Sequence, residues 1–254
     1  MIKELIEKIK QKKELSGLPA SLVEEELEKC ILSSNINTSE LKMAEAKSLI
    51  KKVRARLRLM SGRFTVSLKK RLNLVKNNKI EDLLKTNSST NERIYFYPEL
   101  VKIIHDLGIK KILDLGCGLN PIALANRNMK YFAADINNQD LEVVNYFFKN
   151  NNMDGETFFY DLRKIKDDLP SVDLCILFKV LDLIENKGHK KTEEILKKVK
   201  SKYFLISFST KTLSGRKMNH PQRGWIEKLL SRLCFSFNTV KTKNEIFYLA
   251  NART

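Results

Sequence analysis

Residues 110–121 read KKILDLGCGLNP, and this stretch decides the fold. Its first six residues, KKILDL, form a short β-rich run that predicts a strand, and Gly116 and Gly118 follow that run directly. Two glycines at this spacing permit a tight turn in which the backbone approaches a ligand closely. Open α/β sheets bind ligands at the carboxyl ends of their strands, so the sequence predicts a ligand site at this turn.

From about residue 92 onward, short β-rich runs alternate with helical stretches. This alternation predicts a doubly wound, mainly parallel α/β sheet with helices on both faces. The last two runs predict an antiparallel hairpin that closes the sheet. The expected strands are residues 110–115, 130–136, 156–162, 172–180, 202–209, 235–242 and 244–250, and the expected helices between them are 98–107, 139–150 and 189–199.

The first part of the chain reads as helical instead. We therefore predict an all-helical domain of residues 1–87, followed by an α/β domain of residues 88–254. The Asn-, Ser- and Thr-rich segment 77–92 predicts a linker or surface loop. The expected helices are residues 1–15, a second from an N-cap at Ser21 to about 32, a third that opens at Thr38 to Leu41 and ends at 58, and a fourth over 66–75.

Composition excludes several classes of protein. The 254 residues are 43% hydrophobic and 30% charged, with 9 Gly and 5 Pro, which excludes disordered and collagen-like chains. No apolar run approaches the roughly 18–20 residues of a membrane span. The N-terminus mixes acidic with basic residues, unlike a signal or transit peptide, so a cytoplasmic location is expected. The four cysteines and three histidines show no metal-binding spacing, so no metal site is expected.

Positive charge is concentrated in one segment. The formal net charge is +17, and residues 42–85 alone hold 14 basic against 3 acidic residues. A solvated helix face normally mixes both signs, so this run favours a surface that binds nucleic-acid phosphates. A lysine-rich proteome and a membrane-surface helix are the alternatives. The candidate RNA-binding residues here are Lys51, Lys52, Arg54, Arg56, Arg58, Arg63, Lys69, Lys70 and Arg71.

Two classes of cofactor fit the glycine turn. Asp135 lies 21 residues after Asp114, at the end of the next expected strand, where a carboxylate accepts hydrogen bonds from ribose hydroxyls. A dinucleotide fold also wants a third small residue, at which this chain has Pro121. S-adenosylmethionine has no pyrophosphate and needs no third glycine. It is therefore the favoured cofactor, and a nicotinamide-dependent oxidoreductase is the weaker alternative.

Several stretches then resemble known motifs. Asp114 to Asn120, Asp135 and the pair Asp161-Leu162 resemble motifs of class I S-adenosylmethionine-dependent methyltransferases. Four further stretches resemble the aminoglycoside-resistance 16S ribosomal RNA methyltransferases, which modify N7 of a guanine in the decoding site. They are STNERIYFYPEL (89–100), GLNPIALA (118–125), FKVLDLIE (178–185) and ISFSTKTLSGR (206–216), the last followed by Trp225. The resemblance covers roughly residues 88–250 and implies a seven-stranded methyltransferase sheet.

The resemblance also implies roles for single residues at the cofactor. Arg93, in the stretch with Thr90 and Glu92, would pair with the methionine carboxylate. Gly116 and Gly118 would line the methionine moiety. Asp135 would bind the ribose, and Asp161 with Leu162 the adenine. The expected cofactor set is completed by Cys117, Asn120, Ile136 and Phe178.

On the substrate side, the resemblance implies that Phe178 and Lys179 lie beside the transferred methyl group. Lys211 and Arg216 would contact rRNA phosphate or the target guanine, which makes Phe178, Lys179 and Lys211 the expected catalytic set. The substrate-side loop would also include Ser209 and Thr210, with His220 and Trp225 as further candidates.

This chemistry suits the residues present. Guanine N7 carries an in-plane lone pair and no proton, so its methylation needs orientation rather than a base or a covalent nucleophile. Pyrimidine C5 methylation uses a Pro-Cys pair, which this sequence lacks. We therefore expect a monomeric methyltransferase that acts on 16S rRNA in the small (30S) ribosomal subunit. A methyltransferase for tRNA or another rRNA base, or a non-catalytic RNA-binding protein on the same fold, are the alternatives.

Overall fold

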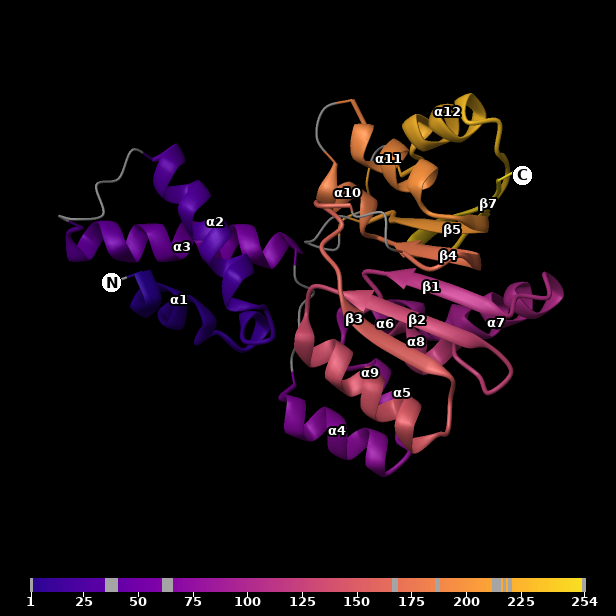
Figure 1. Ribbon diagram of the computed structural model, residues 1–254, viewed down its shortest axis with the longest axis horizontal. Coiled ribbons are helices and arrows are strands. Elements are labelled where there is room, and N and C mark those ends of the chain that lie inside the picture. Colours follow the sequence, from indigo (N-terminus) through magenta and orange to yellow (C-terminus); the bar gives the residue numbers. More distant parts are fainter. Residues whose placement is uncertain are drawn as a thin grey trace.

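The computed structural model describes residues 2–34, 41–60, 66–165, 169–185, 188–211, 216, 218 and 221–252. Within them, seven strands form one sheet in the order β3-β2-β1-β4-β5-β7-β6 (Figure 1). The first five strands run parallel, and β7 pairs antiparallel with β5 and β6. This confirms the expected doubly wound sheet and its closing hairpin. The strands are β1 (Lys111–Leu115), β2 (Lys130–Asp135), β3 (Gly155–Phe159), β4 (Val172–Phe178), β5 (Ser201–Ser209), β6 (Ser236–Lys241) and β7 (Glu245–Asn251).

Helices cover both faces of the sheet. Successive strand residues point to opposite faces, so Leu174 and Ile176 of β4 join one core layer while Cys175 and Leu177 join the other. The first layer lies under α4 (Leu68–Lys76), α5 (Ile80–Leu84), α7 (Tyr97–Asp106), α8 (Asn120–Leu124) and α9 (Asn138–Asn150). The second lies under α10 (Leu181–Ile184), α11 (Lys190–Lys198) and α12 (Gly224–Arg232).

The N-terminal helices build a core of their own, which we call the helical unit. It contains α1 (Ile2–Lys10), the 3₁₀ helix η1 (Lys13–Leu15), α2 (Ala20–Ser33) and α3 (Met43–Met60). Leu5, Ile9, Leu27 and Val53 are among its buried side chains, and Ile136, just after β2, packs against them. The unit lies to the left of the sheet in Figure 1.

Two expected boundaries in this unit are wrong. The first helix ends at Lys10 rather than Leu15, because Lys12 is extended and a separate 3₁₀ turn follows. The second begins at Ala20, with Pro19 rather than Ser21 in the N-cap position. Thr38, expected near the start of the third helix, lies outside the described residues.

The expected linker over residues 77–92 is also wrong. This segment holds α5 and most of α6 (Ser88–Arg93), which leads into the 3₁₀ helix η3 (Ile94–Phe96). Its polar residues act as a helix cap, because the Asn87 side chain accepts hydrogen bonds from the backbone N–H groups of Ser89 and Thr90. Leu83 and Leu84 are buried against the sheet layer.

The packing of α4 and α5 indicates where the chain divides into two domains. Val75 of α4 and Leu83 and Leu84 of α5 belong to the core of the sheet, not to that of the helical unit. We therefore propose a domain boundary between α3 and α4 instead of after residue 87. No helix in the described parts of the chain is long and apolar enough to cross a membrane.

Candidate functional site

The turn after β1 depends on its two glycines. Gly116 has φ +75°, and a Cβ atom built there would lie 2.3 Å from Val180 Cγ1. Gly118 has φ +48°, and its N–H donates to Asp135 Oδ2 at 2.9 Å. Positive φ and the approach of Val180 both exclude a side chain at Gly116, so the backbone itself forms the wall of this site.

Asp135 ends β2 opposite that turn. Its Oδ1 accepts a hydrogen bond from the backbone N–H of Asn137 at 2.9 Å, while its Oδ2 holds Gly118. Burial raises the pKa of this carboxyl. A carboxylate has several lone pairs on its two oxygens, which suits it as an acceptor for ribose hydroxyls.

Asp161 follows β3 and is held by Arg163. The guanidinium donates from Nε to Oδ1 at 2.9 Å and from Nη2 to Oδ2 at 2.8 Å. Burial opposes the charged form of Asp161, but the hydrogen bonds from Arg163 outweigh it and lower the pKa of the carboxyl. Asp161 is therefore an ionised acceptor at neutral pH. Leu162 beside it is buried in the second core layer.

Arg93 lies in a buried polar network. It donates from Nη2 to Glu245 Oε1 at 2.8 Å and from Nη1 to Asn120 Oδ1 at 2.7 Å. Its guanidinium carbon lies 4.5 Å from the centre of the Phe178 ring. Arg93 thus binds Glu245, a carboxylate of the protein itself. The resemblance implies that Arg93 pairs with the methionine carboxylate of the cofactor instead.

Lys179 joins the same network through Glu245. Its backbone has φ +57°, and its N–H donates to Ser207 O at 3.0 Å. The ammonium lies 2.7 Å from Glu92 Oε2 and 3.4 Å from Glu245 Oε2. A residue held in the left-handed region at a strand end is a strained feature that occurs often at functional sites. Phe178, Lys179, Arg93 and Asn120 thus lie in one network around Arg93 and Glu245.

The other expected cofactor residues have structural roles as well. Cys117 is buried, and burial raises the pKa of its thiol well above the usual range, so it is no nucleophile at neutral pH. Ile136 faces the helical unit. Thr90 is buried and donates its hydroxyl to Leu84 O.

The substrate-side loop is described only in part. The Lys211 backbone exchanges hydrogen bonds with the Ser209 hydroxyl, and Arg216 is exposed. Trp225 stacks on His189 with ring centres 4.0 Å apart and packs against the second core layer, which is a structural role. His220 lies outside the described residues.

The basic residues of α3 lie on a helix with an apolar buried face. Arg54 donates to the carbonyl oxygens of Lys8 and Ile9 at the end of α1, and Arg56 and Arg58 pair with Glu26 and Glu14. Lys51 and Lys52 are exposed. Arg63 falls outside the described residues.

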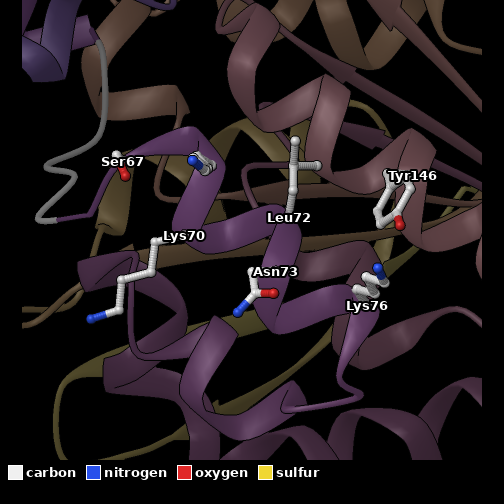
Figure 2. A pocket seen from close by; sticks show the side chains of 7 residues that line it. Ser67, Lys70, Leu72, Asn73, Lys76 and Tyr146 are labelled. Atoms are coloured by element: carbon white, nitrogen blue, oxygen red, sulfur yellow. The ribbon is translucent and has the colours of Figure 1, made fainter.

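The basic residues of α4 divide into two groups. Arg71 is 1% exposed and forms an ion pair with Asp140 of α9. Its side chain is therefore buried and does not form part of an RNA-binding surface, contrary to the prediction. Lys69, Lys70 and Lys76 are exposed. An open groove of about 590 Å³ runs along this helix, and Figure 2 shows Lys76 and the Tyr146 ring at one end of it.

Sequence reasoning missed two residues that organise the site, Glu245 and Arg163. Glu245 is 2% exposed and meets Arg93 from a position 152 residues away, so no local motif connects them. A lone acid at the head of the apolar run EIFYLA was the only signal for Glu245. No feature of the sequence pointed to Arg163.

The donor set fits S-adenosylmethionine. Asp135 and Asp161 offer acceptors for ribose hydroxyls and for an exocyclic amine, and the positive φ of the two glycines keeps the backbone open between them. Arg93 and Lys179 offer cations for a carboxylate, in competition with Glu245. No group of this set is arranged for a pyrophosphate, since Pro121 occupies the third position of the dinucleotide motif.

Comparisons with known proteins agree with this geometry. The family model described as ribosomal RNA methyltransferase (FmrO) matches residues 74–249, which is more than half of the chain. A 16S rRNA (guanine(1405)-N(7))-methyltransferase of Serratia marcescens is 27% identical over 176 residues, which cover 67% of this chain and 69% of the relative. A protein of the same name from Proteus mirabilis is 30% identical over 141 residues, 53% of this chain and 50% of the relative.

Solved structures share the fold over the whole chain. The 16S rRNA methyltransferase RmtF, in complex with S-adenosyl-L-homocysteine, aligns with a TM-score of 0.82 at 21% identity and covers 99% of this chain and 98% of its own. The 16S rRNA methylase RmtB aligns with a TM-score of 0.77 at 20% identity and covers 100% and 99%. These likenesses include the helical unit as well as the sheet.

Proposed function

The chain belongs to the ribosomal RNA methyltransferase (FmrO) family and is an S-adenosylmethionine-dependent enzyme. From that premise we propose that it methylates N7 of a guanine in the decoding region of 16S rRNA, in the small ribosomal subunit, as the aminoglycoside-resistance enzymes do. The observation that carries the proposal is that the glycine turn, Asp135 and Lys179 lie at the carboxyl ends of the adjacent parallel strands β1, β2 and β4. The enzyme acts in the cytoplasm, where the small subunit is found, and as a monomer.

The cofactor supplies an activated methyl group on a sulfonium centre. Asp135 would accept hydrogen bonds from the ribose hydroxyls, Asp161 would accept one from the adenine amine, and the turn at Gly116 and Gly118 would receive the methionine moiety. Arg93 would exchange part of its contact with Glu245 for the methionine carboxylate. These contacts would present the methyl group to the side of the site that holds Phe178 and Lys179.

Lys179 orients the target base. Its ammonium donates to O6 of guanine, which aims the adjacent N7 lone pair at the methyl carbon. N7 forms the new bond as the sulfur–methyl bond breaks, so the positive charge passes from sulfur to the guanine ring. Glu92 and Glu245, 2.7 and 3.4 Å from the Lys179 ammonium, balance that charge. No proton is removed during transfer, and no nucleophilic side chain is needed.

Exposed cations support docking on RNA. Lys51 and Lys52 of α3 and Lys69, Lys70 and Lys76 of α4 lie on neighbouring parts of the chain, and each phosphate that they neutralise releases counterions. Lys211 and Arg216 extend this set on the substrate side. The target guanine must leave its stack, which costs a few kcal/mol, and docking on a folded subunit offsets that cost.

The test is methyl transfer from labelled S-adenosylmethionine to purified bacterial 30S subunits. The modified base is mapped by borohydride reduction and aniline cleavage, which cut RNA at 7-methylguanosine, followed by primer extension. We expect one cleavage in the decoding region. Transfer to tRNA instead, or cofactor binding without transfer to any RNA, would refute this function in favour of the two alternatives.

Resistance gives a second readout. A methyl group at N7 removes an acceptor from the major-groove edge of guanine and adds a positive charge, which repels a cationic aminoglycoside. Expression of the chain in a susceptible bacterium should raise the inhibitory concentration of aminoglycosides that bind the decoding region, and a Lys179→Ala variant should not.

A further inference from the structure

Arg163, in the loop after β3, connects the cofactor side of the sheet to helix α2. Arg163 grips Asp161 with Nε and Nη2, as described above, and its third nitrogen, Nη1, donates to Glu26 Oε1 at 2.7 Å. Arg163 and Glu26 are 137 residues apart in the sequence. One planar guanidinium therefore joins a carboxylate of the cofactor site to a carboxylate of the helical unit.

Glu26 is a fixed anchor for this link. It is 2% exposed, and besides Arg163 it accepts hydrogen bonds from Arg56 Nε at 3.0 Å and Lys29 Nζ at 3.1 Å. A buried carboxylate held by three cations cannot turn away without leaving charges unpaired. Arg163 is therefore positioned by the helical unit and not by the sheet alone.

The orientation of Asp161 follows from Arg163. In addition to the two hydrogen bonds from its guanidinium, Arg163 donates its backbone N–H to Asp161 Oδ1 at 3.0 Å. A cavity of about 410 Å³ lies beside this carboxylate, with α2 forming one wall and the end of β3 the other. Its lining includes Leu22 and Glu25 of α2 and Phe159, Tyr160 and Asp161 of the strand and its loop. The adenine end of the site is thus bordered by both units.

We propose that Arg163 is a positioning residue that couples cofactor binding to the placement of the helical unit. Its guanidinium orients the Asp161 carboxylate toward the adenine amine only while Glu26 binds the remaining nitrogen, Nη1. The inference rests on the proposed function, because it uses Asp161 as the adenine acceptor. Linkage makes the coupling reciprocal, so a helical unit docked on RNA and a bound cofactor affect each other's affinity.

Glu26→Gln tests the coupling without touching the cofactor site. The amide keeps the shape of the side chain but removes the charge that holds Arg163. We expect the Kd for S-adenosylmethionine, measured by calorimetry on the full chain, to rise roughly three- to tenfold. We expect kcat at saturating cofactor to stay within about twofold of wild type, which separates weaker binding from general loss of structure.

Glu156→Gln is the matched control. Glu156 pairs with Lys130 at 2.6 Å near the start of β3, so this variant loses the same charge from the strand that precedes Asp161 but keeps every contact of Asp161 and Arg163. Its Kd for S-adenosylmethionine should match wild type. Arg163→Lys gives a second route, because one ammonium cannot replace a fork that holds two carboxylates. Combined with Glu26→Gln, it should raise the Kd no further than either change alone.

Three results would overturn the coupling. They are an unchanged Kd in both Glu26→Gln and Arg163→Lys, an equal rise in Glu156→Gln, or full additivity in the double variant. A wild-type chain that binds no S-adenosylmethionine would instead refute the proposed function, and the coupling with it. Thermal unfolding of each variant establishes that it is folded, and if Glu26→Gln is not, Arg163→Lys and its control decide.

Discussion

Asp135 is the residue on which cofactor affinity should depend most. One carboxylate holds the turn through the Gly118 N–H and also serves as the ribose acceptor. In Asp135→Asn an amide group replaces one acceptor, so the Kd for S-adenosylmethionine in calorimetry should rise at least about tenfold, or about 1.4 kcal/mol. Asp135→Ala should abolish measurable binding.

Asp173 provides the control for that measurement. It also accepts two backbone N–H groups, those of Lys110 and Lys111, each at 2.8 Å, but it lies at the opposite end of the parallel strands. Asp173→Asn should bind the cofactor as wild type does. An equal loss in the two variants would mean that Asp135 acts only through the stability of the fold.

Asp114 should make the stability of the protein depend on pH. Burial raises its pKa to about 7, opposed by a hydrogen bond from Tyr131 and by other polar neighbours. The unfolded chain has the ordinary pKa near 3.8, so the folded state holds the proton more tightly. The resulting stabilisation is fully present below about pH 4 and is lost as the pH rises through about 7.

Asp114→Asn removes this dependence. Urea unfolding at pH 5 and pH 8 should show a smaller fall in the free energy of unfolding for the variant than for wild type. The free energy of unfolding of the variant should therefore rise relative to that of wild type between pH 5 and pH 8. Parallel curves for the two proteins would show that Asp114 has no raised pKa in the folded state.

Residues whose roles depend on their sequence neighbours could be predicted, and residues paired through space could not. Gly116, Gly118 and Asp135 were found because a tight turn and the end of the next strand leave a local pattern. The pairing of Glu245 with Arg93 and of Glu26 with Arg163 left no local pattern, because each glutamate binds an arginine far away in the chain. A single sequence contains no record of such pairs.

At the scale of elements, periodicity explains both the successes and the errors. Short β-rich runs of six to nine residues predicted every strand of the described sheet, although the strand in the run at 156–162 ends at Phe159. Short helices were harder, since α5 and α10 have five and four residues and too few turns to show a repeat. The helix α12 was also missed, and α6 was concealed by its polar cap at Asn87.

Helix α4 should bind RNA through its exposed face. Charge reversal of Lys69, Lys70 and Lys76 to Glu should weaken binding to 30S subunits at least about tenfold and lower the salt dependence of log Kd by about two to three. Cofactor affinity should not change, because Arg71 keeps the helix in place through Asp140. Filter binding over a range of salt concentrations measures both effects.

The matched control reverses three exposed lysines on the opposite face of the sheet, Lys190, Lys197 and Lys228 on α11 and α12. It changes the net charge equally. If both triple variants lost the same affinity, attraction would come from the total charge and α4 would have no particular role.

In the whole molecule, the helical unit meets the sheet at the proposed cofactor site. Gly17 O accepts the N–H of Asn138 just after β2, and a Cβ at Gly17 would lie 2.1 Å from Asn137 Oδ1. Glu26 meets Arg163 just after β3. The helical unit is thus attached to the two strand ends that we propose to hold ribose and adenine.

The proposed boundary between α3 and α4 predicts how the chain divides. A fragment of residues 66–254 keeps α4 and α5, whose Val75, Leu83 and Leu84 fill the core of the sheet. A fragment of residues 88–254 loses them, and each buried leucine is worth about 1.5–3 kcal/mol against a total stability of about 5–15 kcal/mol. We expect cooperative thermal unfolding and a monomeric elution profile from the longer fragment only. If the fragment from residue 88 unfolded at the same temperature, α4 and α5 would be dispensable to the sheet. The boundary would then belong after residue 87, because no buried contact of those helices would be needed to close the core.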